Sequence, residues 1–287
     1  MIVLGQKSES MSANNPFEHI RLFGENFGQR HAIEIVNFIV SFAAPIDASD
    51  HARFEDHRGA IQDMFASVEA LTGVQIQFNV NSPQPSVSSG QPPTAPKVLT
   101  EFARNGAPRW TATFGDQNQI VVSSRAYDGW EAVWPEAKRR LAVLLECIDQ
   151  YKPVRSIEHS VTDTFSSPTE RNALVCKNFF VENPHLPTHL LEYGDPRWDI
   201  SHGWFDDFEG DSQKLVRFDA RGFLQNQLTV FSVSNLNALR PDRFQLLRDY
   251  LANDAQELES SFSNFHEANK EFLRKILHHQ LLRKMGL

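Results

Sequence analysis

The sequence has 287 residues, of which 41% are hydrophobic and 22% charged, enough to bury a core in one large domain or two closely packed halves. The net charge of −8 at pH 7 disfavours nucleic acid as a partner. Binding of nucleic acid to a local basic patch stays an alternative. Two cysteines, and no apolar run near the ~20 residues of a membrane-spanning helix, predict a cytoplasmic protein with free thiols and no membrane contact.

The first half opens with a terminus that we expect to be disordered, residues 1–15, which lacks a signal-peptide pattern. A strand at 31–42 is apolar on both faces, so we expect it to be central and covered on both sides. A helix follows, from caps near Asp47 to Gly73, and then a strand at 74–80.

Residues 81–97 contain five prolines and four serines. This composition predicts a loop, either a tolerated insertion or a lid. At 108–124 two alternating runs flank the turn Gly-Asp-Gln-Asn, which is typical of a β-hairpin. Trp110, Ala112 and Phe114 share one face of this hairpin, and we predict that they are core residues.

A helix begins at Trp130 and carries the basic triplet 138–140, which we expect on a solvated face. The second half then repeats the first in outline. Alternation predicts a strand at 154–165 and, after short helical segments, three antiparallel strands within 198–234.

The predicted fold class is therefore α+β, with two similar antiparallel sheet-plus-helix halves packed together and a long C-terminal helix. The order of strand, helix, three strands and long helix occurs twice, although no residue-level repeat supports a duplication. We place the first half, the second half and the C-terminal helix at 16–152, 153–240 and 241–287.

The C-terminal helix is predicted to begin near Pro241, after which no Gly or Pro occurs until Gly286. A continuous helix of this length would span about 65 Å, longer than a compact domain of this size. It therefore bends, or it projects to bind a protein partner or a second copy of the chain. We predict that its basic end binds an acidic partner through Arg274, Lys275, His278, Arg283 and Lys284.

Candidate catalytic residues are histidines and carboxylates on two strands. His159 and Asp163 lie four residues apart on one predicted strand face, and they form either an acid–base pair or a structural hydrogen bond. His202 and Asp206 lie on a later strand, although Asp199 has the opposite parity. Phosphate-loop, nucleophile-elbow and Cys–His metal motifs do not occur, so we predict no cofactor and no metal.

Several segments resemble a known family. They are IEIVNFIVSF, the hairpin PRWTATFGDQNQIVVSSRAY, the junction YDGWEAVWPEAKRRL and the closing NFHEANKEFLRKIL. With Tyr127 and Trp130 at a helix entry, and His266 and Asn269 near the end, the chain resembles a sporadically distributed bacterial family of uncharacterised α+β proteins.

The central segment departs from that family's Arg-Tyr-x-Asn-like pattern, because His159 stands near the Arg-Tyr and Asp163 near the Asn. The resemblance implies an α+β protein with the patchy distribution of mobile or defence-associated genes. It supplies no catalytic residues.

These patterns favour a non-enzymatic protein-interaction or regulatory subunit, for example in a bacterial defence or toxin–antitoxin-like assembly. One alternative is a metal-dependent hydrolase or nuclease that uses His159, Asp163, His202 and Asp206 in a sheet groove. The other is a nucleic-acid or small-ligand-binding module.

Overall fold

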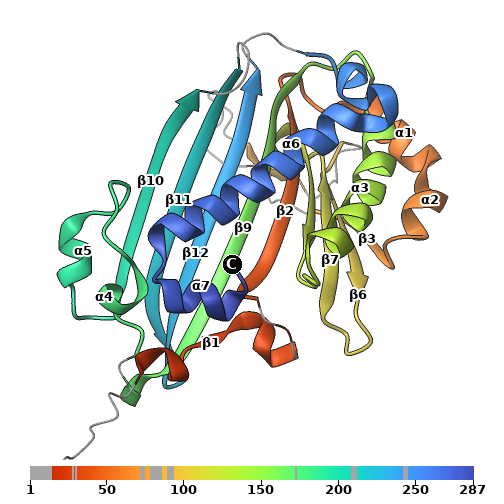
Figure 1. Cartoon of the computed structure of the whole chain (residues 1–287). Coiled ribbons are helices and arrows are strands. Elements are labelled where there is room, and N and C mark those ends of the chain that lie inside the picture. Colours follow the sequence, from red (N-terminus) through yellow and green to blue (C-terminus); the bar gives the residue numbers. More distant parts are fainter. Residues whose placement is uncertain are drawn as a thin grey trace, which may run out of the picture.

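The computed structural model describes residues 15–27, 29, 31–71, 75–77, 86–88, 94–171, 173–207, 212–241 and 245–287. Residues 1–14 of the expected disordered terminus and most of the expected loop at 81–97 lie outside these residues. Within them the predicted α+β class is confirmed, because one large antiparallel sheet carries the helices on one face (Figure 1).

The sheet is continuous from edge to edge, with β1 (Arg21–Leu22) paired to the end of β9. A separate pair consists of β4 (Gln75–Gln77) and β5 (Ser86–Ser88). The strands of the large sheet follow the order β10 (Trp198–Asp207), β11 (Ser212–Gln225), β12 (Leu228–Pro241), β9 (Val154–Pro168), β2 (Ile33–Phe42), β8 (Gln119–Ser124), β7 (Pro108–Phe114), β6 (Lys97–Phe102) and β3 (Ser67–Ala70).

The antiparallel pair β2 and β9 forms the centre of the sheet, and the order of strands is similar on its two sides. Outward from β2 come β8, β7 and β6, and outward from β9 come β12, β11 and β10. The two halves therefore share one sheet. Each half also has short helices after its central strand and a long helix at its end: α1 (Ala48–Asp56), α2 (Arg58–Gln62) and α3 (Trp130–Glu146), then α4 (Cys176–Phe179), α5 (Thr188–Glu192) and α6 (Leu247–Ile276).

Strand alternation places the core on the helix-covered face. On β2, Val36, Phe38 and Val40 are buried there, whereas Ile35 and Ile39 on the opposite face are only half-buried. The expectation that β2 is covered on both sides is therefore wrong. An antiparallel sheet tolerates one solvated face because its strands need no crossover helices on both sides.

The hairpin of β7 and β8 is confirmed. Gly115 begins its turn with a φ of +87°, a backbone conformation that favours glycine. Trp110, Ala112 and Phe114 are buried, as predicted for core residues. They belong to one apolar core with residues of α1, α2 and α3.

Two expectations for the first half are corrected. The helix expected up to Gly73 is instead two helices, α1 and α2, and it ends at Gln62; Val68 pairs with Leu99 between the edge strand β3 and its neighbour β6. A β-branched valine fits a strand better than a helix. Of the basic triplet, Arg140 is buried rather than solvated, because it lies three residues after the buried Ala137 on the inner face of α3.

The C-terminal helix also differs from its prediction. Pro241 is the last residue of β12, and α6 begins only at Leu247. The helix is interrupted at Ala252–Ala255, where Asn253 and Asp254 adopt positive φ, and a separate helix, α7 (His279–Met285), follows. Instead of projecting, α6 crosses the helix-covered face of the sheet (Figure 1).

Helix α6 connects two apolar cores. Its residues Phe262 and Phe265 join the core of the first half, under α3. Phe272 and Ile276 join the core of the second half, under α4, α5 and α7. One helix is therefore packed against both halves of the molecule.

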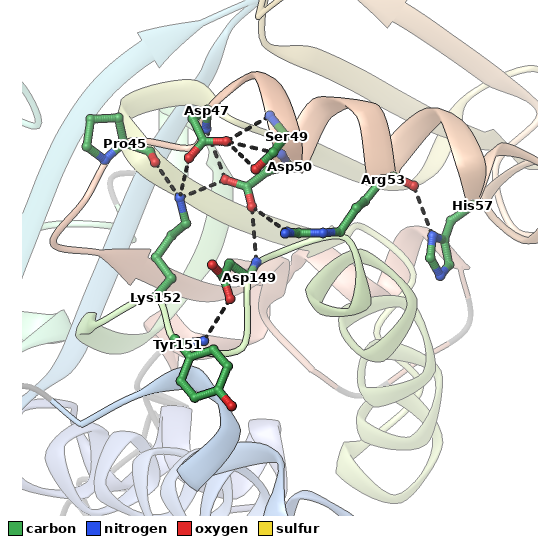
Figure 2. Close-up of polar contacts among 9 residues, drawn as sticks. All are labelled: Pro45, Asp47, Ser49, Asp50, Arg53, His57, Asp149, Tyr151 and Lys152. Carbon is green, nitrogen blue, oxygen red and sulfur yellow. Dashed lines mark hydrogen bonds and ion pairs between the residues drawn. The ribbon is translucent and has the colours of Figure 1, made fainter.

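A buried ion-pair network joins α1 to the chain that enters β9 (Figure 2). The ammonium of Lys152 lies 2.7 Å from Oδ2 of Asp50 and donates to the carbonyl oxygen of Pro45 at 2.5 Å. Oδ1 of Asp50 also accepts from Arg53 and from the backbone N–H of Asp149, each at 3.0 Å. The carboxylate of Asp50 is fully buried, so this network fixes the start of α1 to the turn that leads into the second half.

Candidate functional site

Polar side chains form a buried belt between the two apolar cores. On α6 the belt lies between Phe265 of the first core and Phe272 of the second, and on β9 it lies between Val161 and Phe165. Each member is at most 4% exposed. The members of this polar belt are Asp163 of β9, Asn235 and Asn237 of β12, and His266 and Asn269 of α6.

Strand register and helix spacing bring Asp163, Asn235, His266 and Asn269 together, and Asn237 lies one inward position further along β12, opposite His159. In the β9–β12 ladder Asp163 lies opposite Val233, and Asn235 lies opposite Val161, so both polar side chains point from the covered face of the sheet. His266 and Asn269 are three residues apart and lie on the buried side of α6. The amide nitrogen of Asn235 donates to Oδ1 of Asn269 at 3.1 Å, which joins the sheet to the helix.

The belt has more hydrogen-bonding capacity than it uses. Among the described residues, Oδ1 of Asp163, Nε2 of His266 and Oδ1 of Asn235 have no hydrogen-bond partner. Most buried polar atoms in folded proteins are paired, and an unpaired one costs about 1–3 kcal/mol. Such a concentration of unpaired atoms therefore calls for a ligand or bound water.

A cavity of about 120 Å³ adjoins the belt. Its apolar wall includes Ala32, Leu273 and Met285, and Leu287 also reaches it. Gly286 ends α7 with a φ of +77°, and the N–H of Leu287 donates back to Leu282. The polar wall consists of His31, Tyr127, Asp163, His266, Asn269 and Lys270.

Aromatic rings enclose the other side of the belt. The ring of Trp130 stacks on His266 with centroids 4.2 Å apart and also on Trp134 at 5.6 Å. The rings of Trp130 and His159 meet edge to face, and the ring centroids of His159 and Phe38 are 5.4 Å apart. The entry of α3 and the middle of α6, far apart in the sequence, therefore meet at this site.

Burial changes the protonation of these groups. It raises the pKa of Asp163 to about 7 and lowers the pKa of His159 to about 3, with His266 as a smaller cause. Burial, followed by the charge of Lys270, lowers the pKa of His266 to about 4. It also holds the pKa of Tyr127 well above its ordinary value. Near pH 7 both histidines are therefore neutral, and the carboxyl of Asp163 is close to its midpoint.

The predicted pairing of His159 with Asp163 does not form. Both residues are on the covered face of β9, as their parity predicts, and both are buried. Four strand residues separate their Cα atoms by roughly 13 Å, however. Neither ring nitrogen of His159 has a hydrogen-bond partner in the described part of the chain. Only Asp163 lines the cavity, so the two do not act as an acid–base pair.

His202 and Asp206 lie elsewhere. Both are exposed on the edge strand β10, and β11 and β12 separate them from β9. They share a face, opposite Phe218 and Lys214, whereas Asp199 has the other parity. The structure therefore does not gather the four predicted catalytic residues. Within the described ranges, no group of three or more His, Cys, Asp and Glu is placed to hold a metal ion.

The basic tail is partly used within the fold. His278 caps α7 by accepting from the N–H of Gln280, and its ring stacks on Phe17 at 4.7 Å. Lys284 pairs with Glu25 at 3.2 Å. The remaining members of the predicted binding surface are exposed: Arg274, Lys275 and Arg283.

The apolar side of the tail is docked in the second core, where Leu281 is fully buried. We expect Leu281→Ala to lower the free energy of unfolding by about 2–5 kcal/mol, because it leaves a cavity in that core. The exposed Arg283→Ala should change it by less than about 0.5 kcal/mol. Urea unfolding followed by tryptophan fluorescence measures both. Equal effects of the two substitutions would contradict the docked position of α7.

Sequence reasoning missed two members of the site that had a readable signal. Asn235 and Asn237 occupy inward positions of β12, between the apolar Val233 and Leu239. Polar residues at core positions of an alternating strand are unusual unless they are functional. The sequence singled out Tyr127 only as part of the helix entry in the family resemblance, not as a member of a site.

Comparison of the sequence with protein-family models gives no match, and neither does comparison with curated proteins. Among the helices that the structure describes, none combines the length and the apolar character needed to cross a membrane. A function is therefore inferred from the polar belt and its cavity.

Proposed function

We propose that this protein is a non-enzymatic regulatory subunit that binds a small polar molecule in the cavity between β9 and α6. The observation that carries the proposal is that Asp163 and His266, both buried and both with an unpaired polar atom, line one cavity of about 120 Å³. A ligand that bonds both atoms would remove two unfavourable desolvation terms. An apolar cavity with a few convergent polar groups is also typical of small-molecule sites.

The size of the cavity limits the ligand. An engineered apolar cavity of about 150 Å³ admits benzene, so about 120 Å³ suits a molecule of roughly six non-hydrogen atoms or fewer. A polymer such as nucleic acid does not fit. The distance of His202 and Asp206 from the cavity, and the enclosure of His159 by aromatic rings, favour binding over turnover.

The regulatory part of the proposal follows from α6. This helix contacts both cores, so a ligand between it and the sheet can affect both halves. The acidic protein partner inferred from the sequence is part of the same proposal. It would bind the exposed basic residues Arg274, Lys275 and Arg283.

Three probes of equal size test the cavity: acetamidinium, acetamide and acetate. We expect at least one to give saturable shifts of the His266 ring signals in NMR. Ala32→Leu should abolish them, because Ala32 is fully buried in the cavity wall and three added carbons fill much of the space. Ala107→Leu, an exposed loop position between β6 and β7, is the matched control and should bind like the wild type.

Circular dichroism checks that both leucine variants are folded. If none of the three probes gives a saturable shift in the wild type, or if Ala32→Leu binds as well as Ala107→Leu, the cavity is not the binding site.

A further inference from the structure

We infer that the cavity takes a small organic cation, with an ammonium or amidinium group whose N–H groups bond the carboxylate of Asp163. This inference rests on the proposed function and specifies its ligand class. It comes from the charges, the hydrogen-bonding atoms and the rings around the cavity.

The charges around the cavity favour a cation. Asp163 has no cationic partner in the described chain, and burial is the cause of its raised pKa. Among the described residues that line the cavity, Lys270 carries an ammonium, and this group is paired with Glu267 at 2.8 Å. His31 and His266 line the same wall, and burial lowers the pKa of each, which leaves them uncharged at pH 7. When Asp163 is ionised, the cavity therefore carries one unbalanced negative charge.

An anion is disfavoured by the same arrangement. It would place a second negative charge beside the buried carboxylate of Asp163, and like charges at close range disfavour the charged form of each group. A neutral ligand would satisfy the hydrogen bond of Asp163 without balancing its charge. Only a cation does both.

The remaining atoms fit the N–H groups of such a ligand. Nε2 of His266 has no partner, and a neutral imidazole can accept a hydrogen bond there. The rings of Tyr127 and His31 meet edge to face at 5.3 Å and form part of the same wall. An aromatic ring beside a cation adds electrostatic attraction. Carboxylate, imidazole and aromatic ring thus provide complementary contacts on one small cation.

The three isosteric probes separate the ligand classes, because acetamidinium, acetamide and acetate have the same size and differ in charge. By isothermal titration at pH 7.5 and matched ionic strength, we expect acetamidinium to bind at least tenfold more tightly than acetamide or acetate. Asp163→Asn should remove that preference. Asp128→Asn, which neutralises an exposed carboxylate next to Tyr127, should keep it.

The carboxyl carbon signal of Asp163 in the unmodified protein gives an independent readout in case Asp163→Asn does not fold. Acetamidinium should shift this signal toward that of an ionised carboxylate. Equal or tighter binding of acetamide or acetate would contradict the inference that the ligand is a cation. It would not contradict the proposal that the cavity is a binding site. A retained preference in Asp163→Asn, or an unmoved Asp163 signal on saturation, would overturn the role of Asp163. Failure of all three probes would overturn the proposed function as well.

Discussion

Asp163→Asn should stabilise the protein at pH 8 while leaving its stability at pH 4 nearly unchanged. Burial raises the pKa of Asp163 to about 7, so the folded chain holds a proton that the unfolded chain releases near pH 4. The protonated carboxyl of Asp163 therefore stabilises the folded state fully below about pH 4, and this stabilisation is lost as the pH rises through about 7. Asparagine has no proton to lose. The free energy of unfolding of the variant should therefore exceed that of the wild type by an amount that grows to about 2–4 kcal/mol at pH 8.

The difference in the free energy of unfolding between the wild type and Asp163→Asn separates the effect of Asp163 from the effect of the buried histidines. Burial lowers the pKa of His159 to about 3 and that of His266 to about 4. Their neutral forms therefore stabilise the folded state above about pH 6.5, and this stabilisation is lost as the pH falls through those two values. That loss is common to both proteins and cancels in the comparison. Urea unfolding at pH 4, 6 and 8 measures the difference, and a value that does not change with pH would contradict an unpaired, buried carboxyl at Asp163.

Lys152→Met should lower the free energy of unfolding by about 3–5 kcal/mol. Lys152 is the ammonium that neutralises the fully buried carboxylate of Asp50 (Figure 2). Removing it leaves Arg53 as the nearest cation, and that side chain is 38% exposed. Methionine keeps the packing of the stem, so the effect measures the lost charge and the lost bond to Pro45.

Lys138→Met is the matched control, because Lys138 pairs with Glu259 while both side chains are more than 30% exposed. It should change stability by less than about 1 kcal/mol. Comparable losses in the two variants, measured by urea unfolding at pH 7, would show that the network around Asp50 is no stronger than a surface ion pair.

Much of the fold could be predicted from the sequence because alternation and turn residues act locally. The hairpin of β7 and β8, the strands β10, β11 and β12, and the capping of α1 by Asp47 all depend on neighbours within a few residues. Pro241 was assigned wrongly because a proline can end a strand as well as begin a helix. The fixed φ of proline fits both positions.

The site could be predicted only in part. The shared face of His159 and Asp163 follows from their spacing, and both are buried there. The separation of His202 from them depends on the order of strands in the sheet, which alternation does not determine. His266 and Asn269 reach Asp163 only because α6 docks across the sheet, about a hundred residues further along the chain. Tertiary docking of this kind leaves no local pattern.

The central ladder of β2 and β9 also has a consequence for how the chain folds. Neither half is a closed unit, because each would present its innermost strand as a bare edge without the other. The residues that join these strands in the ladder are more than a hundred positions apart, so the ladder closes only after both have been synthesised. Until then the backbone N–H and C=O groups along one edge of β2 have no partner strand, and another extended segment could pair with them. We therefore expect the two halves to form their shared sheet together, rather than to fold first as two separate modules and then associate.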